Sequence, residues 1–173
     1  MIFLRLLVLL AVIGVTNAAR AQVLWLKVEG PQRSFIVEMP AAPEYKITQQ
    51  RSGSGTAYDY HSYALNRGPI DYVVQTAIYP ADVDTSKPQA LLQFLLDATA
   101  RNLAGAKWQQ VGWMTVQGAT AAEATGALPD GKSLRQILAL KDRHIFILGV
   151  SGPAGTVKFP DADRFLKSLK LFP

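Results

Sequence analysis

Residues Ser133–Phe172 read SLRQILALKDRHIFILGVSGPAGTVKFPDADRFLKSLKLF, and this stretch decides the fold. Its first part predicts two strands, Ser133–Leu140 and Ile145–Val150, joined by a tight turn at 141–143. In the second strand, Ile145 to Leu148 is apolar without alternation, which indicates that both faces of the strand are covered. One helix covers only one face of a sheet, so the fold needs a second covering layer.

The end of this stretch predicts an amphipathic helix that supplies one of the two covers. Apolar side chains recur at positions i, i+3, i+4 and i+7. Acidic residues in the first turn and lysines in the last complement the helix dipole. The apolar positions are Ala162, Phe165, Leu166 and Leu169, and the charged positions are Asp161, Asp163, Lys167 and Lys170.

Upstream, turn residues predict a three-stranded meander over residues 119–151. Pro129-Asp130-Gly131 predicts a hairpin with a primed turn, which Asp-Gly readily adopts. Ala119–Leu128 is a strand of small residues, so we expect a helix to pack closely over it. Another strand, Trp108–Val116, precedes it, with Gly112 as the expected bulge.

The second covering helix is expected before these strands. Ser86 at the N-cap and Gln89 three residues later form a capping-box pattern. The helix runs to about residue 104 and stops at Gly105, because glycine tolerates a left-handed C-cap. Its apolar stripe comprises Leu92, Leu96, Thr99 and Leu103, widened by Leu91 and Leu95.

The first half of the chain predicts further strands. Thr56–Leu65 and Ile70–Tyr79 flank strong turn residues and form a hairpin. Glu44–Arg51 alternates as a solvated strand, and Phe35–Met39, which ends at Pro40, is predicted to be a short edge strand. Val23–Glu29 is either an irregular strand or a segment over the core. The fold class is therefore α+β, an antiparallel β-sheet between helices.

The N-terminus has the pattern of a secretory signal peptide. Arg5 precedes the apolar run Leu6–Val15, and Ala19-Arg20-Ala21 forms an A-x-A cleavage site. The apolar run is shorter than the roughly 20 residues that span a bilayer. We expect residues 1–21 to be the signal peptide and residues 22–173 to be a single domain, exported to the periplasm or secreted. An uncleaved anchor is the alternative.

Charge and cysteine content narrow the classes of function. The full chain has 18 basic and 13 acidic residues, a net charge of +5. Arg5 and Arg20 are lost with the signal peptide, which leaves 16 basic residues and a net charge of +3. Without a cluster of basic residues, nucleic acid is not an expected partner. The chain has no cysteine, which excludes disulfides, thiolate metal sites and a cysteine nucleophile.

Several motifs together resemble the PsbP-like family of exported bacterial proteins, with its PsbP and Mog type α-β-α sandwich. They are SFIVEMP at 34–40, Tyr79-Pro80, Ala90-Leu91-Leu92, the Gly118 turn and PDADRFLKSL at 160–169. The resemblance covers residues 35–172 and implies the same sandwich. It also implies action by binding a partner protein, since the photosystem II subunit and the Ran-binding factor similar to this family act in that way. It carries no catalytic motif.

Few residues suit catalysis or metal binding. Asp59 and His61 share one strand face and form half of a metal site, or a polar solvent-facing pair. His144 follows Asp142 and Arg143 in a turn, where we expect a surface residue. Asp82 and Asp84 offer oxygens to calcium but lack the other ligands of a calcium loop.

The tyrosine-rich hairpin is the most prominent candidate surface. Tyrosine combines an apolar body with a polar tip and is enriched at interfaces, although core packing is the alternative for each residue. The candidate partner- or ligand-facing residues are Tyr58, Asp59, Tyr60, His61, Tyr72 and Tyr79.

From these patterns we expect an exported, non-catalytic interaction module of the cell envelope, and no cofactor. Its partner would be an unidentified envelope protein, contacted through a sheet edge or the tyrosine hairpin, with no stable membrane insertion once the signal is removed. The alternative is a small-ligand or divalent-metal binding protein that uses Asp59, His61 or the Asp82/Asp84 loop. A hydrolase is the least favoured function.

Overall fold

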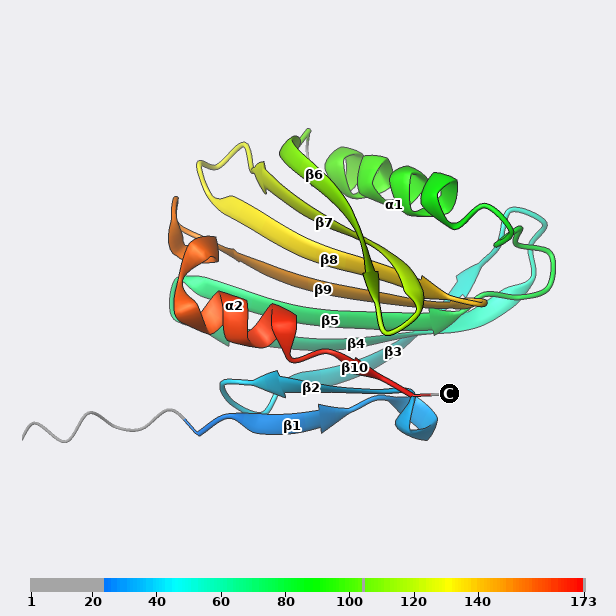
Figure 1. Ribbon diagram of the computed structural model, residues 1–173, viewed down its shortest axis with the longest axis horizontal. Coiled ribbons are helices and arrows are strands. Elements are labelled where there is room, and N and C mark those ends of the chain that lie inside the picture. Colours follow the sequence, from blue (N-terminus) through cyan, green and yellow to red (C-terminus); the bar gives the residue numbers. More distant parts are fainter. Residues whose placement is uncertain (1–23, 104, 173) are drawn as a thin grey trace, which may run out of the picture.

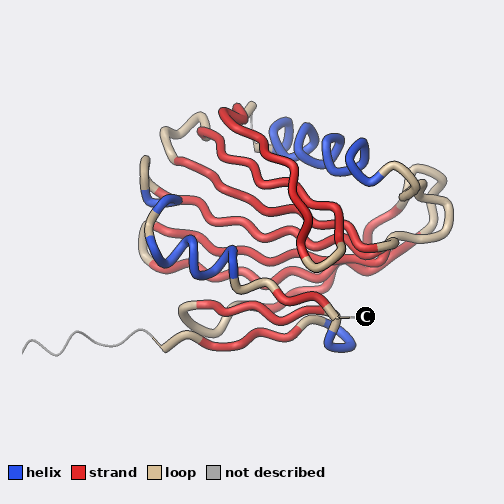
Figure 2. Tube along the Cα trace, viewed as in Figure 1, coloured by secondary structure: helices blue, strands red, loops and turns tan. Residues whose placement is uncertain are grey.

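A computed structural model of the protein describes residues 24–103 and 105–172. The predicted signal peptide, residues 1–21, and its cleavage site lie outside this range. Most of the described chain forms antiparallel strands, and two α-helices pack against them (Figures 1 and 2).

The larger sheet has seven strands in the order β3-β4-β5-β9-β8-β7-β6, and every neighbouring pair is antiparallel. The predicted tyrosine hairpin and the three-stranded meander are both confirmed within it. The strands are β3 (Glu44–Arg51), β4 (Ala57–Arg67), β5 (Ile70–Ile78), β6 (Lys107–Val116), β7 (Ala119–Ala127), β8 (Ser133–Lys141) and β9 (His144–Gly152).

A second, three-stranded sheet lies below the first in Figure 2 and was not predicted. It contains β1 (Leu26–Glu29), β2 (Phe35–Met39) and β10 (Lys170–Leu171), in the order β1-β2-β10. The prediction that Phe35–Met39 is an edge strand is therefore wrong. Pro31 and Pro40 lie outside the paired residues, so both sides of β2 are free to pair.

Two turns differ from the expected geometry. The Asp130-Gly131 hairpin forms, but only Gly131 has a positive φ, +82°, so the turn is not a primed one. The primed turn instead joins β6 to β7, where Gln117 and Gly118 have φ of 49° and 84°. The β6 bulge lies between Trp108 and Gln110 rather than at Gly112, which pairs regularly with Glu123.

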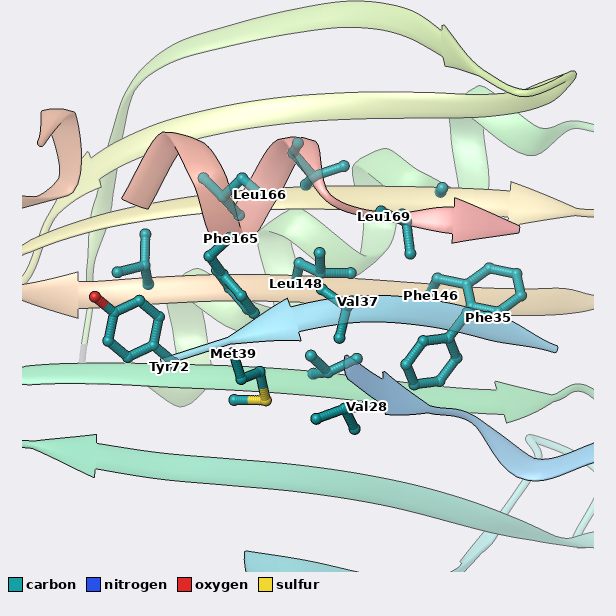
Figure 3. Packing of buried hydrophobic residues seen from close by; sticks show 14 of the residues in the cluster. Val28, Phe35, Val37, Met39, Tyr72, Phe146, Leu148, Phe165, Leu166 and Leu169 are labelled. Carbon is teal, nitrogen blue, oxygen red and sulfur yellow. The ribbon is translucent and has the colours of Figure 1, made fainter. Parts of the chain in front are cut away.

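The larger sheet is covered on both faces, as the apolar strand β9 requires. Phe146, Leu148 and Val150 pack on one side in a core formed with β2 and the closing helix (Figure 3). Ile145 and Ile147 pack on the other side, in a core with the first helix. The expected sandwich between helices is thus correct on one face, whereas a small sheet shares the other face with a helix.

The closing helix, α2 (Pro160–Lys167), buries the predicted residues Ala162, Phe165 and Leu166. The short 3₁₀ turn η2 (Thr156–Lys158) precedes it, and another, η1 (Pro31–Arg33), joins β1 to β2. Arg135 on β8 fixes α2 to the sheet. Its guanidinium donates to Asp163 Oδ1 at 2.5 Å and to Glu123 Oε1 at 2.6 Å.

The other helix, α1 (Pro88–Asn102), begins one residue later than predicted and lacks the capping box. Lys87 occupies the N-cap without a side-chain hydrogen bond, and the Ser86 amide donates to Asp84 Oδ1 at 2.9 Å. The Gly105 cap is confirmed. With φ of +90°, Gly105 donates its amide to the Ala100 carbonyl at 3.0 Å.

Small residues on β7 allow α1 to approach the sheet, as expected. Ala122 and Ala124 are fully buried in the same core as Leu92 and Leu96 of the helix. Leu103, the last residue of the predicted stripe, is partly exposed at the end of the helix.

Phe35 is expected to be the aromatic side chain that holds the two sheets together. It is fully buried and makes edge contacts with Tyr63 and Phe146, at ring-centroid distances of 5.8 and 6.1 Å. Phe35→Ala should lower the free energy of unfolding by about 3–5 kcal/mol, because it leaves a cavity between the sheets. Urea denaturation followed by circular dichroism measures this change.

Phe94→Ala, at a site 59% exposed on α1, is the control and should lower the free energy of unfolding by about 0.5 kcal/mol or less. Equal costs for both variants would contradict the role of Phe35.

Candidate functional site

The six candidate residues do not form one surface, because successive side chains on a strand point to opposite faces. Tyr58, Tyr60 and Tyr79 face α1 and belong to the core beneath it. Asp59, His61 and Tyr72 are on the opposite face of the sheet, toward the three-stranded sheet and α2.

The tyrosines on the α1 side fill space between the helix and the sheet. Tyr58 and Tyr79 make an edge contact with ring centroids 5.7 Å apart, and the Tyr60 hydroxyl donates to Gln75 Oε1 at 3.1 Å. Burial raises the pKa of Tyr60 to about 12 and also raises the pKa of Tyr79. These phenols therefore stay neutral and structural at physiological pH.

Tyr72 lies in the core on the other face. It is 3% exposed, and its ring packs edge-on against Phe165 of α2, with centroids 5.3 Å apart (Figure 3). Burial raises the pKa of its hydroxyl. No side of this ring is open to a partner.

Asp59 and His61 do line a cleft, and the structure adds a residue that the sequence did not place there. The cleft, of about 390 Å³, lies between the larger sheet and the η1 end of the smaller one. The neighbouring strands β4, β5 and β9 bring His144 onto the same face as His61. His61 Nδ1 is hydrogen-bonded to the Tyr45 hydroxyl at 2.8 Å.

The expectation that His144 is a surface residue is wrong. Its ring stacks on Phe146 with centroids 4.1 Å apart and is more than half buried. The Thr76 hydroxyl donates to the Ile145 carbonyl at 2.8 Å, so its oxygen accepts from Nε2–H of His144 at 2.7 Å. Burial, with a smaller contribution from His61, lowers the pKa of His144 to about 4, so the ring is neutral and its Nδ1 carries a free lone pair.

The metal alternative depends on side chains that could hold an ion together. Nowhere in residues 24–103 and 105–172 do three His, Asp or Glu side chains group closely enough to hold a metal ion. Asp82 accepts hydrogen bonds from Ser52 and Ser54, which lower its pKa, and Asp84 accepts from Ser86. Their oxygens therefore serve the surrounding loops.

A second polar cleft, of about 380 Å³, is lined by Arg135, Glu123, Asp163 and Lys158. Arg135 already binds both carboxylates. Its charge is compensated within the protein, so this cleft does not offer a free guanidinium to an anionic ligand.

The two edges of the larger sheet differ in a way that bears on partner binding. Edge strand β3 carries Glu44, Lys46 and Arg51, and such charges discourage pairing with another strand. Edge strand β6 has no charge or proline in residues 108–116, WQQVGWMTV. This uncharged run was the sequence signal for an open edge. Our prediction named a sheet edge as a possible contact surface but did not say which strand forms it.

Both faces of β6 present apolar side chains beside the free backbone edge. Trp113 is 43% exposed on the α1 side, with Val111 next to it on the same face, and Met114 is exposed on the α2 side. Gly112 lies between Val111 and Trp113 in the strand, and a Cβ atom added there would have no neighbour within 4 Å. Trp108 is not part of this surface, because its Nε1–H donates to the Leu96 carbonyl at 2.9 Å.

Comparisons with known proteins identify the fold. No model of a known protein family matches the chain, and a search of curated proteins also finds no match. The solution structure of cyanobacterial PsbP (CyanoP) from Synechocystis sp. PCC 6803 superposes with a TM-score of 0.60 at 8% identity, covering 89% of this chain and 96% of that one. The chain therefore has a PsbP-like fold.

A second solved structure agrees with this assignment. PA94 from Pseudomonas aeruginosa, a protein of unknown function, superposes with a TM-score of 0.51 at 13% identity, covering 86% of this chain and 98% of that one. At these identities the likeness shows the fold alone. Within the described residues, no helix is long and apolar enough to cross a membrane.

Burial of His144 should make stability depend on pH. The unfolded chain binds a proton at His144 near its ordinary pKa of 6.5, whereas the folded protein does so only near 4. The free energy of unfolding should therefore fall as the pH decreases from 6.5 to 4, and this contribution should level off below 4. Urea denaturation at pH 7, 5.5 and 4.5 should show a smaller decrease for His144→Gln than for the wild-type protein.

His61→Gln is the control for this experiment, because it removes the other histidine of the cleft, which contributes less than burial to the lowered pKa of His144. It should retain most of the wild-type decrease in stability with pH. An identical decrease in His144→Gln and the wild type would show that His144 does not titrate as its surroundings indicate.

Proposed function

We propose that the protein is an exported, non-catalytic binding module of the cell envelope. In this proposal, strand β6 pairs with an extended segment of another envelope protein, which adds a strand to the larger sheet. The observation that carries the proposal is the exposed edge of β6, uncharged over residues 108–116, opposite an edge strand that is protected by charges.

Strand addition suits this edge for two reasons. The backbone N–H and C=O groups that point away from β7 supply hydrogen bonds to any extended segment, independent of its sequence. Trp113 supplies specificity, because a large aromatic side chain at the centre of an interface commonly dominates its binding energy. The partner segment should therefore be extended, and it should carry apolar side chains on the face that meets Trp113 and Val111.

The proposal that the protein is exported rests on the N-terminal pattern of Arg5, a short apolar run and an A-x-A site. The resemblance to the PsbP-like family supports action through a protein partner. The chemistry of the polar side chains supports a role other than catalysis, because His144 Nε2–H, the Arg135 guanidinium and the Asp82 carboxylate are each bonded to groups of the protein itself.

Photo-crosslinking tests the β6 edge directly. With p-benzoyl-phenylalanine in place of Trp113, irradiation of the envelope fraction should give one crosslinked species with a different protein. The same amino acid in place of Ile47, which is exposed on β3, should give none. Adding Gly112→Lys should abolish the Trp113-site crosslink, because a partner strand would have to desolvate the new charge.

Gly112→Lys should leave the thermal stability unchanged, since its Cβ atom meets no neighbour and the rest of the side chain can extend over the polar cleft beside Glu123. Equal crosslinking from the two edges would contradict the proposal. A crosslink at the Trp113 site to a second copy of this chain would also contradict it, because the edge would then serve self-association.

A further inference from the structure

A cleft of about 420 Å³ lies between the C-terminal half of α1 and the larger sheet, and we name it the α1 cleft. Leu95, Ala98 and Thr99 of the helix form its roof. Its floor comes from β4, β5, β8 and β9. The cleft exists because α1 packs most closely on β7 and β8, and so overhangs the strands beyond them.

The lining of the α1 cleft differs in chemistry from that of the two polar clefts. Leucine, isoleucine, valine and alanine side chains make up most of it, with Leu103 and Leu128 among them. Among the described residues that line it, none carries a charge at neutral pH, because burial keeps the phenol of Tyr60 protonated. Such a lining disfavours ions and favours neutral molecules.

Gly149 makes room for two side chains of the cleft floor. It pairs with Val73 on one side and with Gln136 on the other, and both of these residues line the cleft. A Cβ atom at Gly149 would lie 3.0 Å from Val73 Cγ1 and 3.5 Å from Gln136 Nε2. The Val73 and Gln136 side chains therefore occupy the space above Gly149.

Gln136 presents an unused hydrogen-bond acceptor in the floor of the cleft. The residue is only 7% exposed, and its Oε1 is buried without a hydrogen-bond partner. Nearly all buried polar groups in proteins have a partner, so an exception calls for an explanation. The other glutamine of the floor, Gln75, already accepts from the Tyr60 hydroxyl, so of the two glutamines Gln136 is the one with an unused acceptor.

We propose that the α1 cleft binds a neutral amphipathic small molecule that bears a hydroxyl or N–H group. Its apolar body lies against Val73 and Ile147 of the floor, beneath Leu95 and Ala98, and its donor group satisfies Gln136 Oε1. A cleft of this size, in which apolar side chains are joined by a few polar ones, is typical of small-molecule sites. The site is separate from the β6 edge and does not depend on strand pairing there.

N-phenyl-1-naphthylamine is a suitable probe, because it is neutral and apolar, carries one N–H group and fluoresces more strongly in apolar surroundings. The purified protein should bind it saturably. Its N-methyl analogue, which lacks the N–H, should bind about five- to tenfold more weakly, as expected for the loss of one hydrogen bond to a buried acceptor. 1-Decanol should displace the probe, whereas decanoate, ionised at neutral pH, should not.

Two variants test the assigned residues. Gln136→Leu should remove the preference for the N–H compound over its N-methyl analogue, while the melting temperature stays the same or rises, because the unpaired acceptor is gone. Ala98→Phe should abolish binding of both compounds by filling the cleft from the roof. Gln49→Leu, on the exposed strand β3, is the matched control and should bind both as the wild type does.

The proposal is wrong if the wild-type protein does not bind the probe saturably, or if Ala98→Phe binds it unchanged. It is also wrong if Gln136→Leu keeps the wild-type preference between the two compounds. Gly112→Lys should bind the probe normally, so failure at the α1 cleft and failure at the β6 edge can be distinguished.

Discussion

Strand β9 is apolar on both faces, and the need to bury both of them is the constraint on which the rest of the structure depends. Phe146, Leu148 and Val150 require cover on one side, and Ile145 and Ile147 on the other. Each such side chain stabilises the fold by about 1.5–3 kcal/mol when buried. Exposure of either face would therefore cost an amount comparable with the whole stability of a typical domain, about 5–15 kcal/mol.

Residues from both ends of the described chain meet that requirement on the face of Phe146. Strand β2 lies near the N-terminal end and α2 near the C-terminal end, and they are joined directly. The Glu38 amide donates to the Ser168 hydroxyl at 2.8 Å, and Arg164 pairs with Glu38 at 2.8 Å. Gln117, in the primed turn between β6 and β7, adds bonds to the Leu169 carbonyl and the Leu171 amide at 3.0 and 2.9 Å. The core therefore closes only when these distant segments meet.

The same constraint explains where functional surfaces remain. Most of the candidate tyrosines are used to fill the two cores, and the polar groups beside them are bonded within the protein. What is left open is the uncharged edge of β6 and the space beneath the overhanging end of α1. Neither feature could be predicted from the tyrosine-rich hairpin, because the exposure of a side chain depends on which elements pack above it. Which strands lie at the edges of a sheet is also known only once the order of strands is known.

The sequence by itself determined the local elements. Turn residues and alternation defined the β4–β5 hairpin and the β7–β8–β9 meander, and apolar spacing defined α2, because these signals act between residues close in the chain. Only the tertiary structure decided the three-stranded sheet, in which β2 pairs with β10 across more than a hundred residues. It alone also placed His144 beside His61 and Gly149 between Val73 and Gln136. Such arrangements arise from strand order and packing summed over the whole core, and no local pattern of residues encodes them.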